Sequence, residues 1–294
     1  MFDGKIETLL AVVGEGSYNK AAQKLNLTQP AVTHHIKKLE EEFDCKLVFR
    51  DKTGLRLTPE GKILVKYARR TQALYAACRQ SIEDVRSRVS HFNVGLTHSA
   101  GENVLPQVLA TLCTERPEIH VNITMDTTQK LVEKLKAYEL DFAFVEGPNR
   151  EERLCSMLLD TDYLCLAVSP MHRFARKAST SLAELQNQRL ILRTTQAGTR
   201  ILFEDYLKAN GQSIDDYNVM MEIDNISTIK ELVAMDMGLT VIAHSACREE
   251  ERTGKLVVVP IENMQMVREV NILYHRDFTH VKMLEDICAI YHRA

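Results

Sequence analysis

Apolar residues in the first sixty positions recur at three- and four-residue steps, the spacing of amphipathic helices. A first helix ending near Gly16 is predicted, and its apolar face contains Ile6, Leu9, Leu10 and Val13. A second helix is predicted from about residue 18 to residue 25, with Ser17 as its N-cap. After a tight exit at Asn26, Thr28 can cap a third helix that has Pro30 in its first turn. The short turn between the second and third helices is typical of a helix-turn-helix.

The third predicted helix has two faces of different chemistry. Its apolar stripe consists of Val32, Ile36 and Leu39. The opposite face carries the hydrogen-bonding side chains of Gln29, Thr33, His34 and Lys37. A helix with such a face fits the major groove of B-DNA, although helix pairs with short turns also occur in ordinary bundles.

A hairpin predicted directly after this helix makes DNA binding the favoured interpretation. Residues 46–50 and 55–57 have the composition of short strands, and they flank the turn-forming segment Asp51-Lys52-Thr53-Gly54. The hairpin is interpreted as a wing whose basic side chains, Arg50, Lys52 and Arg56, are placed to contact phosphates. Residues 1–58 are therefore predicted to form a winged helix-turn-helix DNA-binding domain.

Residues 59–90 predict one long helix, because no proline follows Pro59 and no glycine follows Gly61 in this segment. Seven-residue steps connect Leu64, Thr71, Cys78 and Val85, and further apolar residues lie between them. This heptad seam implies a partner helix. The partner is either the second domain of the same chain or, the favoured choice, the same helix of a second copy, since dimers read two half-sites.

Charge is distributed unevenly along the 294 residues. Residues 1–90 contain 16 Lys and Arg against 11 Asp and Glu, whereas residues 91–294 contain 21 against 29. A basic amino-terminal part and an acidic remainder indicate that only the amino-terminal part binds a polyanion. No stretch approaches the roughly 18 apolar residues of a membrane span. Residues 1–5 lack the pattern of a signal peptide, so we expect a cytoplasmic protein with no membrane partner.

The cysteines give no sign of a metal site. They are scattered and include no Cys-x-x-Cys pair: Cys45, Cys78, Cys113, Cys155, Cys165, Cys247 and Cys288. No metal and no cofactor are therefore predicted. Cys155 and Cys165 could form a redox switch, but buried free thiols are the preferred interpretation.

The front of the chain resembles the amino-terminal signature of LysR-type transcriptional regulators. The resemblance is carried by Ala21-Ala22, Leu25, Thr28-Gln29-Pro30-Ala31-Val32-Thr33, Ile36, Leu39-Glu40, Leu47, Phe49-Arg50 and Leu57-Thr58-Pro59-Glu60-Gly61. It covers about the first 65 residues tightly, and the remainder agrees loosely with the family's effector domain. Membership implies a winged helix-turn-helix, a dimerising linker helix at 59–90 and a ligand-sensing domain that resembles periplasmic binding proteins, usually assembled as a tetramer.

The resemblance assigns Ser17 and Thr28 to contacts with the DNA backbone, and it assigns Gln29, Pro30, Thr33 and Lys37 to the groove. His34 and His35 depart from the family's usual Gln or Arg, which leaves the base preference open; they are either surface imidazoles, the preferred interpretation, or pH sensors. The complete set of predicted DNA-binding residues is Ser17, Tyr18, Thr28, Gln29, Pro30, Thr33, His34, Lys37, Arg50, Lys52 and Arg56.

Residues 91–294 alternate strand-like and helix-like segments, the pattern of parallel α/β units. Two such runs predict two lobes, and the resemblance implies that the chain returns to the first lobe near Pro260. We expect an effector-binding domain with lobe I at about 91–161 and 266–294 and lobe II at about 162–265. The predicted fold class is α/β, with a helix-rich winged helix-turn-helix at the amino terminus.

An effector is expected between the lobes, beyond the carboxyl ends of strands and near helix N-termini. The main candidates are Thr97, His98, Ser99, Arg193, Thr194, Thr195 and Gln196, and weaker ones are Glu146, Asn225 and Ser227. These groups suit a small polar or anionic molecule, although ordinary helix caps explain the Ser and Thr residues almost as well. Glu146 would oppose an anion and would fit an amino group on the ligand better.

Two other classes of protein share parts of this pattern. An enzyme could have its active site in the same cleft, but the chain contains no nucleotide-binding glycine loop, no Gly-x-Ser-x-Gly and no His-Glu-x-x-His. A solute-binding protein of a transport system conflicts with the predicted wing and the missing signal peptide. We therefore predict a non-enzymatic, cytoplasmic, dimeric or tetrameric transcription regulator that binds double-stranded DNA and a small effector, with RNA polymerase as a further candidate partner. The effector, the target promoters and the sign of regulation stay open.

Overall fold

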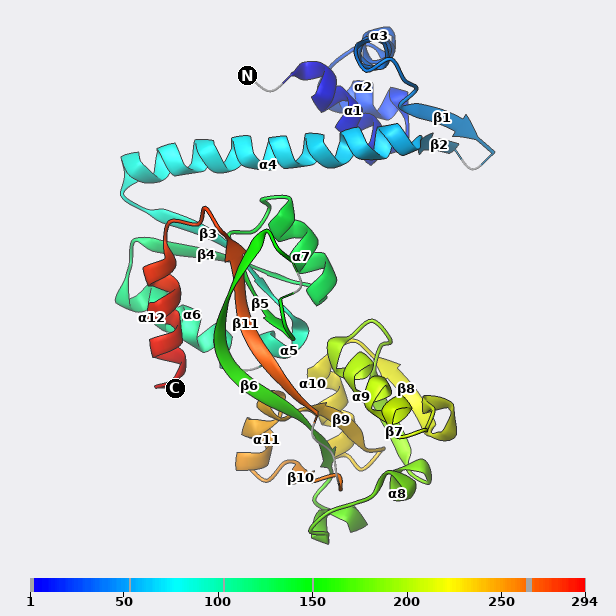
Figure 1. The fold of residues 1–294 in the computed structure, drawn as a ribbon, viewed down its shortest axis with the longest axis vertical. Coiled ribbons are helices and arrows are strands. Elements are labelled where there is room, and N and C mark those ends of the chain that lie inside the picture. The colour runs from blue at the N-terminus through cyan, green and yellow to red at the C-terminus, as the bar shows by residue number, and fades with distance from the viewer. Residues whose placement is uncertain (1–2, 53, 103, 150, 263–265, 294) are drawn as a thin grey trace. The chain divides into compact units, whose positions relative to one another are not determined.

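The computed structural model describes residues 3–52, 54–102, 104–149, 151–262 and 266–293. The chain divides into two compact units (Figure 1). The first unit consists of residues 1–88 with 136–139, and the second of residues 89–135 with 140–294.

The first unit begins with three helices, α1 (Gly4–Glu15), α2 (Tyr18–Leu25) and α3 (Gln29–Glu42). Their shared core contains Leu9, Val12, Ala21, Val32, Ile36, Leu39 and Leu47. The exits predicted at Gly16 and Asn26 are confirmed, because both residues have left-handed backbone, with φ of 62° and 54°. Thr28 caps α3 by accepting a hydrogen bond from Ala31 N at 3.3 Å. Ser17 holds the predicted N-cap position of α2, but its side chain makes no cap hydrogen bond.

The predicted hairpin is confirmed as β1 (Val48–Asp51) paired antiparallel with β2 (Gly54–Leu57). Thr53, which belongs to the predicted turn, lies outside the described residues. Thr58 connects the hairpin to the next helix, because its hydroxyl donates to Lys46 O at 2.6 Å and accepts from Gly61 N at 2.9 Å. Only glycine fits at position 61, since a Cβ there would lie 2.0 Å from Leu47 O.

The predicted long helix is α4 (Pro59–Ser87). Val65 and Ala68 in its first turns are buried. The rest of the helix exposes large apolar side chains, namely Tyr67, Leu74, Tyr75, Ile82 and Val85. Most side chains of the predicted heptad seam are therefore exposed.

The second unit contains a sheet with the strand order β10-β6-β11-β5-β3-β4, and β9 also pairs with β6. Lobe I is defined here by β3 (Ser90–Leu96), β4 (Ile119–Met125) and β5 (Phe142–Glu146), which run parallel. Its helices are α5 (His98–Gly101), α6 (Leu105–Glu115), α7 (Thr128–Lys136) and α12 (Val281–Tyr291). Leu96, Phe142, Phe144, Ile272 and Leu284 are among its buried core residues.

Lobe II contains the parallel pair β7 (Arg189–Arg193) and β8 (Asn218–Ile223), together with β9 (Thr240–Ala243) and β10 (Val257–Val259). Its longer helices are α9 (Gly198–Ala209) and α10 (Ile226–Ala234). The shorter ones are η1 (Arg173–Arg176), α8 (Leu182–Gln186), η2 (Ile214–Asp216), η3 (His244–Ala246) and α11 (Arg248–Arg252). Phe174, Leu192, Phe203 and Val241 lie in its main core.

Two long strands connect the lobes, and they are antiparallel, whereas the predicted parallel pairing is found within each lobe. β6 (Leu154–Val168) is a long strand of 15 residues. It pairs antiparallel with β11 (Val267–His275), and then with β9 and β10 in lobe II (Figure 1). β11 is also antiparallel to β5. The fold is therefore two α/β lobes joined by an antiparallel pair of strands. β6 leads the chain from lobe I to lobe II, and β11 leads it back beside β6.

Candidate functional site

The predicted base-reading face of α3 is accessible. Gln29, Pro30, His34 and Lys37 are exposed, and Thr33 is half-buried. The Thr33 hydroxyl donates to Gln29 O at 3.1 Å and accepts from Gln29 Nε2 at 3.0 Å. These bonds hold the Gln29 side-chain amide, which has both a donor and an acceptor, at the start of α3, where it can reach a base edge.

Flanking groups suited to phosphates lie on α2 and on the hairpin. Burial raises the pKa of Tyr18, so its hydroxyl stays protonated and can donate to a phosphate oxygen. Arg50 and Lys52 are exposed. Arg56 forms an ion pair with Asp51, Nε to Oδ2 at 2.7 Å, which partly neutralises the positive charge predicted for that side of the wing.

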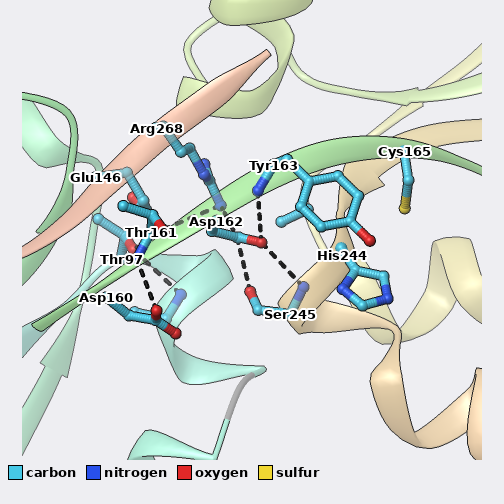
Figure 2. Close-up of polar contacts among 12 residues, drawn as sticks. Thr97, Glu146, Asp160, Thr161, Asp162, Tyr163, Cys165, His244, Ser245 and Arg268 are labelled. Atoms are coloured by element: carbon cyan, nitrogen blue, oxygen red, sulfur yellow. Dashed lines mark hydrogen bonds and ion pairs between the residues drawn. The ribbon is translucent and has the colours of Figure 1, made fainter. Parts of the chain in front are cut away.

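A buried polar network lies where β6 and β11 run side by side (Figure 2). Its centre is Arg268 on β11, which is 8% exposed. Arg268 Nη2 lies 3.1 Å from Asp162 Oδ2 on β6 and 3.6 Å from Glu146 Oε1 at the end of β5. The pairing with two carboxylates is what allows a guanidinium to be buried in a sheet.

Both carboxylates of the network receive further hydrogen bonds. The hydroxyl of Thr97, the N-cap of α5, donates to Glu146 at 2.7 Å. Ser245 in η3 donates to Asp162 through its backbone N at 3.2 Å and through its hydroxyl at 2.8 Å. By contrast, the Nε and Nη1 atoms of Arg268 are buried without a hydrogen-bond partner among the described residues. The network therefore contains donors that its own side chains do not satisfy.

A second charged group lies at the end of β7, before α9. Arg193 is 3% exposed, and its Nη2 donates to Asp224 at 2.9 Å, while its Nε has no partner in the described part of the chain. His98 Nε2 of lobe I lies 3.8 Å from Asp224 Oδ2 of lobe II. Thr195 and Gln196 are exposed at the start of α9, whose N-cap makes no side-chain hydrogen bond.

A third contact between the lobes is made at the start of α10. The Ser227 hydroxyl lies 2.9 Å from each carboxylate oxygen of Glu102 in lobe I. The buried ammonium of Lys230 donates to Ala246 O at 2.9 Å and pairs with Glu250 at 2.9 Å and Glu102 at 3.3 Å. The predicted candidate Asn225 uses its side-chain oxygen to cap α10, accepting from Thr228 N at 2.8 Å.

Some of the predicted effector residues lie close together in the structure, whereas others have purely local hydrogen bonds. Thr97 contacts Glu146, and His98 and Arg193 each contact the same residue, Asp224. Ser99 is buried in α5, and Thr194 accepts the Ala197 N–H through its backbone oxygen. Sequence reasoning missed Glu102, Asp162, Asp224, Lys230, Ser245 and Arg268. The available signal was a charged residue close to a run of apolar residues, as Arg268 is to Val270, Ile272 and Leu273 in β11.

The suggested switch between Cys155 and Cys165 is wrong. Both lie on the single extended strand β6, where ten residues span about 33 Å. Cys165 is instead close to Cys247, with 3.8 Å between the sulfurs. The contact with Cys247 and burial raise the pKa of the Cys165 thiol, which keeps it protonated. The described residues contain no group of three or more side chains suited to hold a metal ion.

A winged helix-turn-helix followed by a two-lobed α/β domain defines a class of DNA-binding transcriptional regulators with an effector-binding domain. Residues 4–62 match the family model of the bacterial regulatory helix-turn-helix protein, lysR family, and residues 86–292 match that of the LysR substrate binding domain. The chain therefore belongs to the LysR family, as its signature predicted.

Two named relatives are transcriptional regulators. The HTH-type transcriptional regulator CysL of Bacillus subtilis (strain 168) is 29% identical over 275 residues, covering 93% of this chain and 91% of the relative. A probable RuBisCO transcriptional regulator of Emiliania huxleyi is 28% identical over 273 residues, covering 92% and 87%.

Solved structures of similar fold include full-length CbnR in complex with its target DNA. It has a TM-score of 0.71 and 18% identity, and the match covers 99% of this chain and 98% of CbnR. A full-length OxyR variant from Pseudomonas aeruginosa has a TM-score of 0.66 and 21% identity, with 98% and 93% covered. At these identities the likeness concerns the fold.

Among the described residues, no helix has the length and apolar character needed to cross a membrane.

Proposed function

We propose that this regulator reads specific DNA through α3 and responds to a small polar or anionic metabolite bound at the network around Arg268. Residues 1–58 would bind DNA, residues 59–90 would dimerise the chain, and residues 91–294 would bind the effector. In this proposal lobe I spans about 91–161 and 266–294, and lobe II spans about 162–265. The observation that carries the effector assignment is the buried Arg268, whose Nε and Nη1 atoms have no hydrogen-bond partner among the described residues.

The predicted DNA-binding residues fall into two groups, those that would contact bases and those that would contact phosphates. Side chains on the exposed face of α3 (Gln29, Pro30, Thr33, His34 and Lys37) would meet base edges. Ser17, Tyr18, Thr28, Arg50, Lys52 and Arg56 would meet phosphates. The ion pair of Arg56 with Asp51 makes Arg50 and Lys52 the stronger phosphate contacts of the hairpin.

The exposed apolar residues of α4 support assembly through this helix. A helix that leaves Tyr67 58% and Val85 82% exposed gains stability when a second helix covers them. We expect a homodimer through α4, further assembled into a tetramer that presents two pairs of DNA-binding units. RNA polymerase is a further proposed partner, and the place of action is the cytoplasm.

The ligand proposed for the network carries both an acceptor and a donor. Arg268 and Arg193 each have a buried N–H that needs an oxygen acceptor, such as a carboxylate. Glu146 accepts one hydrogen bond from Thr97 and lies 3.6 Å from Arg268, so a hydroxyl or amino group on the ligand would complete its hydrogen bonding. Thr97, His98, Ser99, Thr194, Thr195, Gln196, Asn225 and Ser227 would shape or line this site. Its effect on DNA would follow from a change in lobe closure.

A thermal-shift screen of small metabolites on the full chain tests this function, with each hit retested for its effect on DNA affinity. The proposal expects a ligand that raises the melting temperature, changes DNA affinity and is recovered chemically unchanged. A hit that is converted to product would favour an enzyme, and hits that never alter DNA binding would contradict effector control.

A further inference from the structure

The side chain of His35 on α3 contacts a buried residue of α1. Its Nδ1 atom lies 2.8 Å from Oγ1 of Thr8, a residue of α1 with no exposed surface. The same Thr8 hydroxyl lies 2.7 Å from Gly4 O. His35 is therefore half-buried and bound across two helices, unlike the exposed His34 beside it. The interpretation of His35 as a free surface imidazole is wrong.

Counting protons fixes the direction of both hydrogen bonds. A carbonyl oxygen has no proton, so the contact between Thr8 Oγ1 and Gly4 O requires the single proton of the hydroxyl. The contact between Thr8 and His35 also requires a proton, which must then reside on Nδ1 of the imidazole. His35 is therefore the donor, through the proton on its Nδ1 atom.

This bond constrains α3 in a way that the apolar core does not. Val32, Ile36 and Leu39 attach α3 to the core by hydrophobic burial, which is non-directional. A hydrogen bond has a preferred distance and angle, so it resists rotation of α3 about its own axis. Such a rotation would displace every exposed side chain of α3 relative to a base edge.

We propose that His35 is a positioning residue for DNA recognition. Its Nδ1–H bond to Thr8 sets the rotation of α3, and with it the places where Gln29, His34 and Lys37 meet the bases. The inference rests on the proposed role of α3 as the base-reading helix. His35 itself acts through Thr8 and does not read a base.

Four single variants of the full chain test the bond, with an operator selected by the wild-type protein from a random-sequence DNA library. His35→Leu removes the donor and Thr8→Val removes the acceptor, each with little change of size. His35→Asn keeps a donor attached to Cγ, as Nδ1 is, and Thr8→Ser keeps the hydroxyl. The measured quantity is the ratio of affinities for the operator and for random DNA, at a temperature well below every melting midpoint.

His35→Leu and Thr8→Val are each expected to lower this ratio by roughly fivefold, the equivalent of one hydrogen bond. The double variant should lose no more than either single one, because both remove the same bond. His35→Asn and Thr8→Ser should restore the ratio. Glu41→Gln, which breaks an exposed pair with Lys38 on the same helix, should leave it unchanged.

Equal weakening on both DNAs, or His35→Asn behaving as His35→Leu, would overturn the positioning role and leave His35 as a packing residue. Gln29→Ala, measured in parallel, separates this failure from that of the proposed function. If Gln29→Ala lowers discrimination and His35→Leu does not, only the positioning role fails. If Gln29→Ala weakens both DNAs equally, the assignment of α3 fails as well.

Discussion

Glu102 of lobe I and Lys230 of lobe II form an ion pair across the effector-binding domain, with Oε2 and Nζ 3.3 Å apart. The Lys230 side chain is 9% exposed, so the charge depends on this contact and on Glu250 for compensation. Ser227 adds hydrogen bonds to the same carboxylate. Glu102 therefore ties the start of α10 to lobe I.

Glu102→Gln should loosen this connection between the lobes. The amide keeps a hydrogen-bonding group for Ser227 but removes the negative charge that faces Lys230. We expect faster amide hydrogen exchange in the first turns of α10, measured by mass spectrometry on the full chain. Glu133→Gln, at an exposed position of α7, serves as the control and should leave exchange in α10 unchanged. Identical amide exchange in the wild type and in Glu102→Gln would show that the Glu102 carboxylate does not hold the start of α10 against lobe I.

Arg268→Met should destabilise the second unit more than a surface substitution does. It leaves Asp162 and Glu146 buried without their shared cation, and breaking a buried pair in this way costs about 3–5 kcal/mol. Urea unfolding of the full chain measures the loss. Combining Arg268→Met with Asp162→Asn should cost less than the sum of the two single variants, because the pair acts as one unit. Strict additivity would mean that the two side chains are not coupled.

Val85→Glu should weaken self-association. Val85 is 82% exposed on α4, and a charge in a heptad seam has to be desolvated when a second helix covers it. Sedimentation velocity at micromolar concentration is expected to show smaller species than the wild type forms. Glu83→Gln is the matched control, since residue 83 lies about 200° around the helix from residue 85. If Val85→Glu sediments as the wild type does, α4 does not form the interface.

The sequence allowed the first unit to be predicted almost residue by residue because its signals are local. Thr28 and Pro30 define the start of α3 within one turn, and Asn26 ends α2 in the left-handed conformation. In the second unit the alternation of strands and helices and the division into two lobes were predicted correctly. The amino-terminal half of β6 lacks a strand signal in the sequence, because residues 154–162 do not alternate strictly between apolar and polar and include the charged Asp160 and Asp162.

The candidate effector site was only half predictable. Thr97 directly follows β3 and Arg193 is the last residue of β7, so their positions could be inferred from the order of elements. Arg268 and Asp162 are 106 residues apart in the chain, and they meet only because β11 pairs antiparallel with β6. No spacing rule links two residues at that separation. Their partnership depends on the return of the chain between the lobes.

One pair of variants separates the proposed reading of bases by α3 from the proposed contacts of the hairpin with phosphates. Affinities for a selected operator and for random DNA are measured over a range of salt concentrations for Gln29→Ala and Lys52→Ala. We expect Gln29→Ala to lose discrimination with little change in affinity for random DNA. We expect Lys52→Ala to weaken binding to both DNAs and to reduce the salt slope by about one unit. An equal loss of affinity for both DNAs from Gln29→Ala would show that α3 does not read bases.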